Sequence, residues 1–211
     1  MLLLAGRSGA EPEKGGWEVL FDGRDLAAWQ AYGKPSGHVG WVVEEGTLAS
    51  RPKCGDLVSR ELYGDFELEL EWRISPGGNS GVMFRVDDSG PQPWHTGPEM
   101  QVLDDQRHKD GKSPLTSAGA LYALYAPARA AAKPVGEWNA VRIRAQGARL
   151  QFWLNGVPTV DVEIGSADWN ARVAASKFAD KPRFGRVAAG RILLQDHKDP
   201  VWYRNIRIRR L

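Results

Sequence analysis

Two short segments, far apart in the sequence, carry polar side chains of the kinds that exchange protons. Residues 99–103 read EMQVL, and residues 194–197 read LQDH. Successive side chains of a strand point to opposite faces, so Glu99 and Gln101 share one face and the apolar residues between and after them share the other. Gln195 and His197 repeat this arrangement. Carboxyl and imidazole groups are common general acids and bases, so we expect both segments on one exposed sheet face.

The rest of the chain has the alternation typical of strands. Residues 66–74 read FELELEWRI, in which every second residue is apolar. The pair Asn155-Gly156 separates two apolar runs, which is a strong short-range signal for a hairpin. Further strands are expected at residues 81–86, 138–144, 150–154, 191–195 and 202–208.

One segment departs from this pattern. Residues 166–178 begin with Ser166 as a helix cap and place Trp169, Val173 and Phe178 at helical spacing. Many antiparallel strands with one short surface helix predict an all-β, two-sheet jelly-roll sandwich. In such a fold one sheet can curve and leave its outer face as a groove. We expect Glu99, Gln101, Gln195 and His197 to face this groove or plain solvent.

The amino-acid composition limits the classes of function that fit this chain. A chain of 211 residues with 42% hydrophobic residues can bury a core, and a net charge of +2 with dispersed basic residues argues against nucleic acid as a partner. Nine Trp and 24 Gly are typical of sugar-binding β proteins, although core packing is the alternative for most of the Trp. Cys54 is alone, so no disulfide framework or cysteine metal site is expected.

The first residues of the sequence are expected to lie outside the folded domain. Residues 1–14 open with a short apolar run that is incomplete as a signal peptide and too short for a membrane span. We interpret them as a disordered segment or the remnant of an export signal, and residues 15–211 as a single jelly-roll domain.

Nearly the whole chain, from about residue 17 onward, resembles a bacterial family. The matching stretches include residues 17–26, 55–58, 63–85, 96–104, 119–122, 136–139, 154–156, 194–197 and 199–205. Together they resemble the 3-keto-disaccharide hydrolase domain family, formerly a domain of unknown function, whose members have a concanavalin-A-like, laminarinase-like jelly roll. The resemblance implies a small carbohydrate substrate oxidised to a ketone at the third sugar carbon. Family habit also implies export to the periplasm or the extracellular space.

A ketone acidifies the neighbouring C–H bond, so a base can form an enolate that expels the aglycone. This route needs a base, a partner for the enolate oxygen and an acid for the leaving oxygen. The expected catalytic groups are Glu99, His197, Asp104 and His108. The expected substrate-binding groups are Arg85, Gln101, Tyr122, Gln195, Asn205, Trp94, Trp138 and Lys177.

Two other functions stay open. Residues 99–104 resemble the Glu-x-Asp-x-x-Glu strand of laminarinase-type enzymes, which would suit a conventional two-carboxylate glycoside hydrolase. Gln101 at the middle position weakens that interpretation, because an amide cannot relay a proton. A non-catalytic, lectin-like module is the other alternative. No cofactor is evident, and the polar loop at residues 104–111 lacks the spacing of a calcium loop or a zinc motif, so a divalent metal is a secondary hypothesis. No oligomeric state is predicted.

Overall fold

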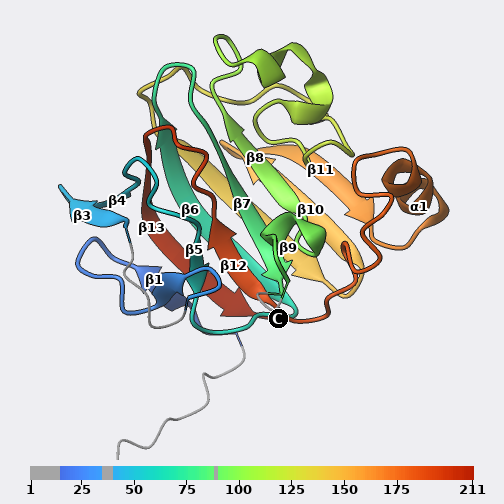
Figure 1. The fold of residues 1–211 in the computed structure, drawn as a ribbon, viewed down its shortest axis with the longest axis horizontal. Coiled ribbons are helices and arrows are strands. Elements are labelled where there is room, and N and C mark those ends of the chain that lie inside the picture. The colour runs from blue at the N-terminus through green and yellow to red at the C-terminus, as the bar shows by residue number, and fades with distance from the viewer. Residues whose placement is uncertain (1–14, 35–39, 88–89) are drawn as a thin grey trace, which may run out of the picture.

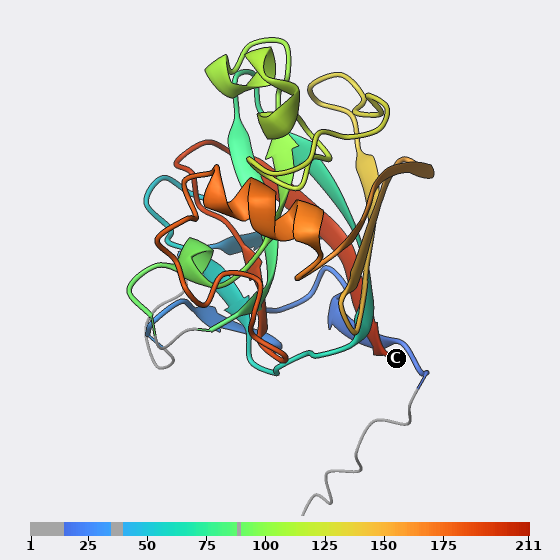
Figure 2. The ribbon, with the colours of Figure 1, turned by 90° about the vertical axis from the view of Figure 1, so that its right-hand side faces the viewer.

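The computed structural model describes residues 15–34, 40–87 and 90–211. The expectation for residues 1–14 therefore lies outside the described residues. Two antiparallel sheets stack face to face, and the short helix α1 (Ala167–Ala174) lies on one flank of the layers (Figures 1 and 2). The predicted all-β jelly-roll sandwich is confirmed.

Each sheet combines strands from distant parts of the chain. The eight-stranded sheet has the order β11 (Val157–Glu163), β10 (Arg149–Leu154), β9 (Asn139–Gln146), β6 (Phe66–Ile74), β13 (Val201–Arg210), β4 (Thr47–Ala49) and β3 (Val42–Glu44), with β1 (Glu18–Phe21) also paired to β13. The five-stranded sheet has the order β2 (Trp29–Ala31), β5 (Leu57–Ser59), β12 (Arg191–Leu194), β7 (Asn79–Val86) and β8 (Glu99–Leu103). The 3-10 turns are Pro93–His95, Lys109–Lys112 and Pro114–Thr116.

The core lies between the sheets and follows the predicted alternation. On β6, Phe66, Leu68, Leu70, Trp72 and Ile74 are buried. From the opposing sheet, Met100, Val102 and Leu194 are completely buried in the same cluster. The inward position of these three residues turns their polar neighbours on β8, and those that follow β12, to the outer face of the five-stranded sheet.

The predicted helix is confirmed but ends earlier than expected. Ser166 caps it, because its hydroxyl accepts a hydrogen bond from the Trp169 N–H at 3.1 Å. Buried Trp169 stacks on Phe184 with ring centroids 6.1 Å apart. Past Ala174 the chain continues in turns, where Phe178 stacks on Phe184 at 4.0 Å. This aromatic anchor fixes residue 177 beside the outer face of the five-stranded sheet.

Candidate active site

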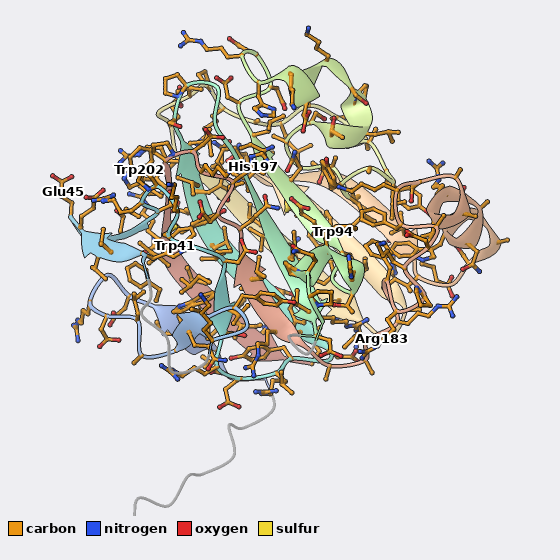
Figure 3. The ribbon with its side chains drawn as sticks, viewed as in Figure 1. Trp41, Glu45, Trp94, Arg183, His197 and Trp202 are labelled. Carbon is orange, nitrogen blue, oxygen red and sulfur yellow. The ribbon has the colours of Figure 1, made fainter. Side chains whose placement is uncertain are left out.

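A cleft of about 290 Å³ lies on the outer face of the five-stranded sheet. We call it the Glu99 cleft. Figure 3 shows His197 and Trp94 over this face of the sandwich. Its lining comprises Asp56, Asn79, Met83, Gln92, Pro93, Trp94, Glu99, Gln101, Tyr122, Lys177, Gln195, Asp196 and His197. The structure therefore brings together eight residues expected at the site: Glu99, His197, Gln101, Gln195, Tyr122, Trp94 and Lys177 line the cleft, and His108 adjoins it through His197.

Glu99 lies on β8 and extends over the neighbouring strand β7. In the register of these strands, Glu99 pairs with Met83 and Gln101 pairs with Gly81. The Glu99 side chain leans diagonally into the space that Gly81, having no side chain, leaves open. Only 8% of Glu99 is exposed, and no protein hydrogen bond to its carboxyl group occurs within the described ranges.

Burial, which has the largest effect, and the nearby carboxylates Asp56 and Asp110 together raise the pKa of Glu99 to about 8, against the opposing effect of Lys177. A carboxyl group with this pKa is mostly protonated at pH 7. It can then donate a proton or a hydrogen bond, which an ordinary surface glutamate does not do at that pH. Glu99 is thus suited to act as an acid.

Lys177 supplies the positive charge of the cleft. Its ammonium nitrogen lies 4.3 Å from the ring centroid of Tyr122 and 5.6 Å from that of Trp94, so two aromatic faces hold it. Burial lowers the pKa of Lys177, while Glu99 and Asp110 act in the opposite direction. A half-buried cation beside an acid is an arrangement that stabilises developing negative charge.

His197 is the most accessible acid–base group of the cleft. Its side chain is 49% exposed, and its Nδ1 lies 3.9 Å from the Asp199 carboxylate. The ring of His108 approaches it edge-on, with centroids 6.2 Å apart. His108 itself is held in its loop, because its Nδ1 accepts a hydrogen bond from the Asp110 N–H at 3.1 Å. The two histidines border the side of the cleft that is open to solvent.

Asp56 is a cleft residue that sequence reasoning missed. Its carboxylate accepts a hydrogen bond from the Asp196 N–H at 2.8 Å, which ties the end of β12 to the start of β5. Burial raises the pKa of Asp56 to about 6, with a further contribution from Asp196. Its only sequence signal was its place directly before the apolar strand residues 57–58, where alternation turns it away from the core side of Leu57 and toward the outer face of the sheet. Asn79, which also lines the cleft, was missed as well.

Two expected residues instead stabilise loops. Asp104 is buried, and its carboxylate accepts hydrogen bonds from the backbone N–H groups of Gly77, at 2.7 Å, and Gln106, at 3.1 Å. Arg85 donates to the carbonyls of Gly64 and Gly147, both at 3.0 Å, and to Asp65. Neither residue lines the cleft, so their expected placement there is wrong.

Two further expectations are wrong because the residues belong to the other sheet. Trp138 is covered by the guanidinium groups of Arg73 and Arg204, at 5.0 and 4.1 Å from its ring centroid. Asn205 lies at a bulge of β13 and donates to Glu71 at 2.8 Å. Trp138 immediately precedes β9 and Asn205 lies where β13 is bulged, and both side chains lie on the outer face of the eight-stranded sheet, on the far side of the core.

That outer face contains a larger cleft, of about 740 Å³, lined by Glu69, Glu71, Arg207 and Trp153 among others. Its two glutamates are bound to arginines: Glu69 to Arg207 and Glu71 to Arg204, each at 2.6 Å. An oxygen of each carboxylate is therefore already engaged by an arginine side chain of the same sheet face. Despite its size, this cleft is a weaker candidate for acid–base chemistry than the Glu99 cleft.

Within the part of the chain that the structure describes, no three His, Cys, Asp or Glu side chains gather closely enough to hold a metal ion. Among residues 15–34, 40–87 and 90–211, no helix has the length and apolar character to cross a membrane.

A jelly-roll sandwich with a polar and aromatic cleft on one outer sheet face is an architecture that carbohydrate-active proteins use. Comparison with known proteins identifies the family within this class. Residues 16–209 match the model of the 3-keto-alpha-glucoside-1,2-lyase-like domain. This chain belongs to that family.

Two relatives agree with this assignment. A protein of Bacteroides thetaiotaomicron named 3-keto-disaccharide hydrolase is 30% identical over 226 residues, covering 92% of this chain and 78% of the relative. The crystal structure of a putative glycosyl hydrolase from Parabacteroides distasonis is 32% identical, with a TM-score of 0.86, and the match covers 93% of this chain and 94% of the other.

A more distant structure shows the fold alone. A Bacillus subtilis protein with a galectin-like fold is 12% identical, with a TM-score of 0.55, over 93% of this chain and 96% of its own.

Proposed function

We propose that this protein cleaves 3-keto-glycosides by eliminating the aglycone, with the Glu99 cleft as its active site. The observation that carries the proposal is the convergence of a buried carboxyl group, a cation and an imidazole in one cleft. The three groups meet the needs of an elimination next to a ketone: an acid, a partner for the enolate oxygen and a base. The family match and the printed name of the Bacteroides relative support the substrate class.

Each group has one role in this reaction. His197 removes the proton from the carbon between the ketone and the anomeric centre. The electron pair moves onto the ketone oxygen, where the ammonium group of Lys177 stabilises the enolate. As the enolate collapses, a double bond forms to the anomeric carbon and the glycosidic C–O bond breaks. Glu99 gives its proton to the leaving oxygen, and the products are a conjugated enone and a free alcohol. Addition of water to the enone would complete a net hydrolysis.

A conventional two-carboxylate hydrolysis is the second candidate. It is favoured by the presence of both Asp56 and Glu99 in the cleft. It requires one carboxyl group to be ionised while the other is protonated, and the raised pKa values of about 6 and about 8 would allow this near neutral pH. The elimination fits better, because it also explains a cation held beside the acid.

The decisive experiment compares a glycoside with its 3-keto analogue. We expect aglycone release and the ultraviolet absorbance of an enone from the 3-keto glycoside only. Equal turnover of both substrates would refute the elimination and support two-carboxylate hydrolysis. Binding of both without turnover would support the lectin-like alternative.

Two further expectations accompany this proposal and need their own tests. Dialysis against a chelator, followed by return of a divalent cation, tests whether a metal ion contributes to turnover. We also propose export to the periplasm or beyond, which cell fractionation of the natural host would test.

A further inference from the structure

Two amide oxygens at the Glu99 cleft lack a hydrogen-bond donor. Gln101 is 1% exposed and Asn79 is 4% exposed. The Nε2 of Gln101 donates to the Thr116 carbonyl at 3.2 Å, and this bond fixes which end of the amide is oxygen. Among the described residues, nothing donates to Gln101 Oε1 or to Asn79 Oδ1.

Unpaired acceptors of this kind are unusual in folded proteins. Most buried polar atoms have a partner, and a buried carbonyl oxygen without one destabilises the fold. Both residues line the cleft, so the cleft is the route by which the missing donor arrives. Two such atoms in one cleft are better explained by a ligand than by two unrelated defects.

The strand register places the two amides as a pair. Gln101 on β8 lies opposite Gly81 on β7, and Asn79 lies opposite Leu103, so the two side chains are diagonal neighbours on the same face. Diagonal pairs are about 7–8 Å apart along the backbone, with side chains closer than that. Gly81 has no side chain, so the surface beside the two amides is covered only by the carboxyl group of Glu99. A single pyranose ring is of the right size to reach both amides.

We propose that Asn79 and Gln101 form a subsite for sugar hydroxyl groups, in which each amide oxygen accepts a hydrogen bond from one hydroxyl of a ring lying along β7 and β8. The inference rests on the proposed function, and it names the substrate class of the same cleft: a neutral glycoside whose ring keeps both hydroxyls free. Because the unpaired atoms are acceptors, the subsite disfavours sugars with a methyl ether, sulfate or carboxylate at these positions.

The test uses the unoxidised parent glycoside as a ligand, so that binding is measured without turnover. Asn79→Leu removes the acceptor at nearly constant volume. We expect about 10-fold weaker binding by calorimetry, as for the loss of one hydrogen bond. The Tm should stay unchanged or rise, because an unpaired buried oxygen has been removed. Asn170→Leu, on the exposed face of α1, is the matched control and should leave the affinity unchanged.

A deoxy glycoside completes a double-mutant cycle. A glycoside that lacks the hydroxyl bound by Asn79 should bind the wild-type protein about 10-fold more weakly than the parent glycoside does. The Asn79→Leu variant should bind the two glycosides with equal affinity. Unchanged affinity in Asn79→Leu, or a lower Tm for this variant, would overturn the subsite. Failure of the subsite with 3-keto turnover intact leaves the proposed function standing. A confirmed subsite without 3-keto turnover refutes only the proposed function.

Discussion

The carboxyl group of Glu99 occupies the space above Gly81 that any side chain at position 81 would fill. A Cβ atom built on Gly81 would lie 2.7 Å from Glu99 Cδ, a separation that real Cβ contacts do not show. Gly81 has no positive φ, so the glycine is required by this close approach and not by backbone conformation. The position of the proposed acid on β8 therefore depends on a residue of β7.

Gly81→Ala should impair catalysis more than stability. The clashing group is the end of a flexible side chain, so Glu99 can move aside at small energetic cost. A displacement of about 1 Å can lower a rate by about 100-fold. Steady-state kinetics with the 3-keto substrate and a thermal melt measure the two effects. Gly90→Ala is the control, since its Cβ would meet nothing closer than 3.9 Å. A variant with wild-type kcat would show that Glu99 does not have to lie over β7.

Turnover should fall as the pH rises through about 8. Burial raises the pKa of Glu99 to about 8, so the protonated form needed for the leaving oxygen predominates below this pH and is lost above it. Glu99→Gln cannot donate a proton and should lower kcat by about 10²–10⁴-fold, leaving a residual rate without the alkaline limb. A pH profile of kcat/KM for both proteins measures this. An unchanged alkaline limb in Glu99→Gln would assign it to another group.

The same pKa predicts a pH-dependent stability. Between pH 4.5 and about 8 the folded protein keeps a proton on Glu99 that the unfolded chain has released, so the free energy of unfolding decreases as the pH rises through this window. The loss is roughly 3–5 kcal/mol across the window. The carboxyl group of Asp56, with a pKa of about 6, adds to this loss of stability in the lower part of the pH window.

Urea unfolding at pH 6 and pH 9 tests the effect on stability. Glu99→Gln should lose much less stability between these two pH values than the wild type, because its amide stays neutral. The control is Glu137→Gln at an exposed position, which should retain the wild-type difference. Equal losses in Glu99→Gln and wild type would mean that Glu99 is ionised in the folded protein.

The sequence predicted those parts of the site that alternation alone determines. The period of two placed Met100 and Val102 in the core, and therefore turned Glu99 and Gln101 outward correctly. Alternation does not say which sheet a strand joins. Asn205 and Trp138 were therefore expected at the cleft, although they lie on the outer face of the other sheet.

Loop residues were harder to predict for a different reason. Asp104 could equally have been catalytic or a backbone acceptor, because both roles use the same carboxylate and only the position of Gly77 distinguishes them. Asp56 was missed because its chemistry arises from burial by segments remote in sequence, including the one that carries Asp196.

Arg85 should matter for stability and not for the chemical step. Its side chain is 7% exposed, and its guanidinium group joins two turns through the carbonyls of Gly64 and Gly147 as well as Asp65. Arg85→Met leaves these acceptors unpaired and should lower the free energy of unfolding by about 3 kcal/mol. Arg149→Met, which removes an ion pair from the exposed surface, should lower the stability far less. A loss of kcat at full stability in Arg85→Met would restore Arg85 as a substrate ligand.

His197 should control exchange of the proton next to the ketone. The turn that carries His197 is held by its neighbours. The Lys198 N–H donates to the Asp196 carboxylate at 2.8 Å. The Asp199 carboxylate lies 3.9 Å from His197 Nδ1 and accepts a hydrogen bond from the Asn79 N–H at 3.1 Å. The imidazole is thereby fixed at the rim of the cleft, where solvent can carry away the proton it removes.

In deuterium oxide, wild-type protein should replace this proton of a 3-keto glycoside faster than background and release the aglycone. His197→Gln should slow both processes by about 10²–10⁴-fold. The matched control is His95→Gln, which replaces a histidine that contacts Trp94 but does not line the cleft; it should alter neither exchange nor aglycone release. Glu99→Gln should slow aglycone release while exchange continues, because exchange needs the base but not the acid. If His197→Gln blocks release and leaves exchange intact, the base is another group and His197 acts on the leaving oxygen.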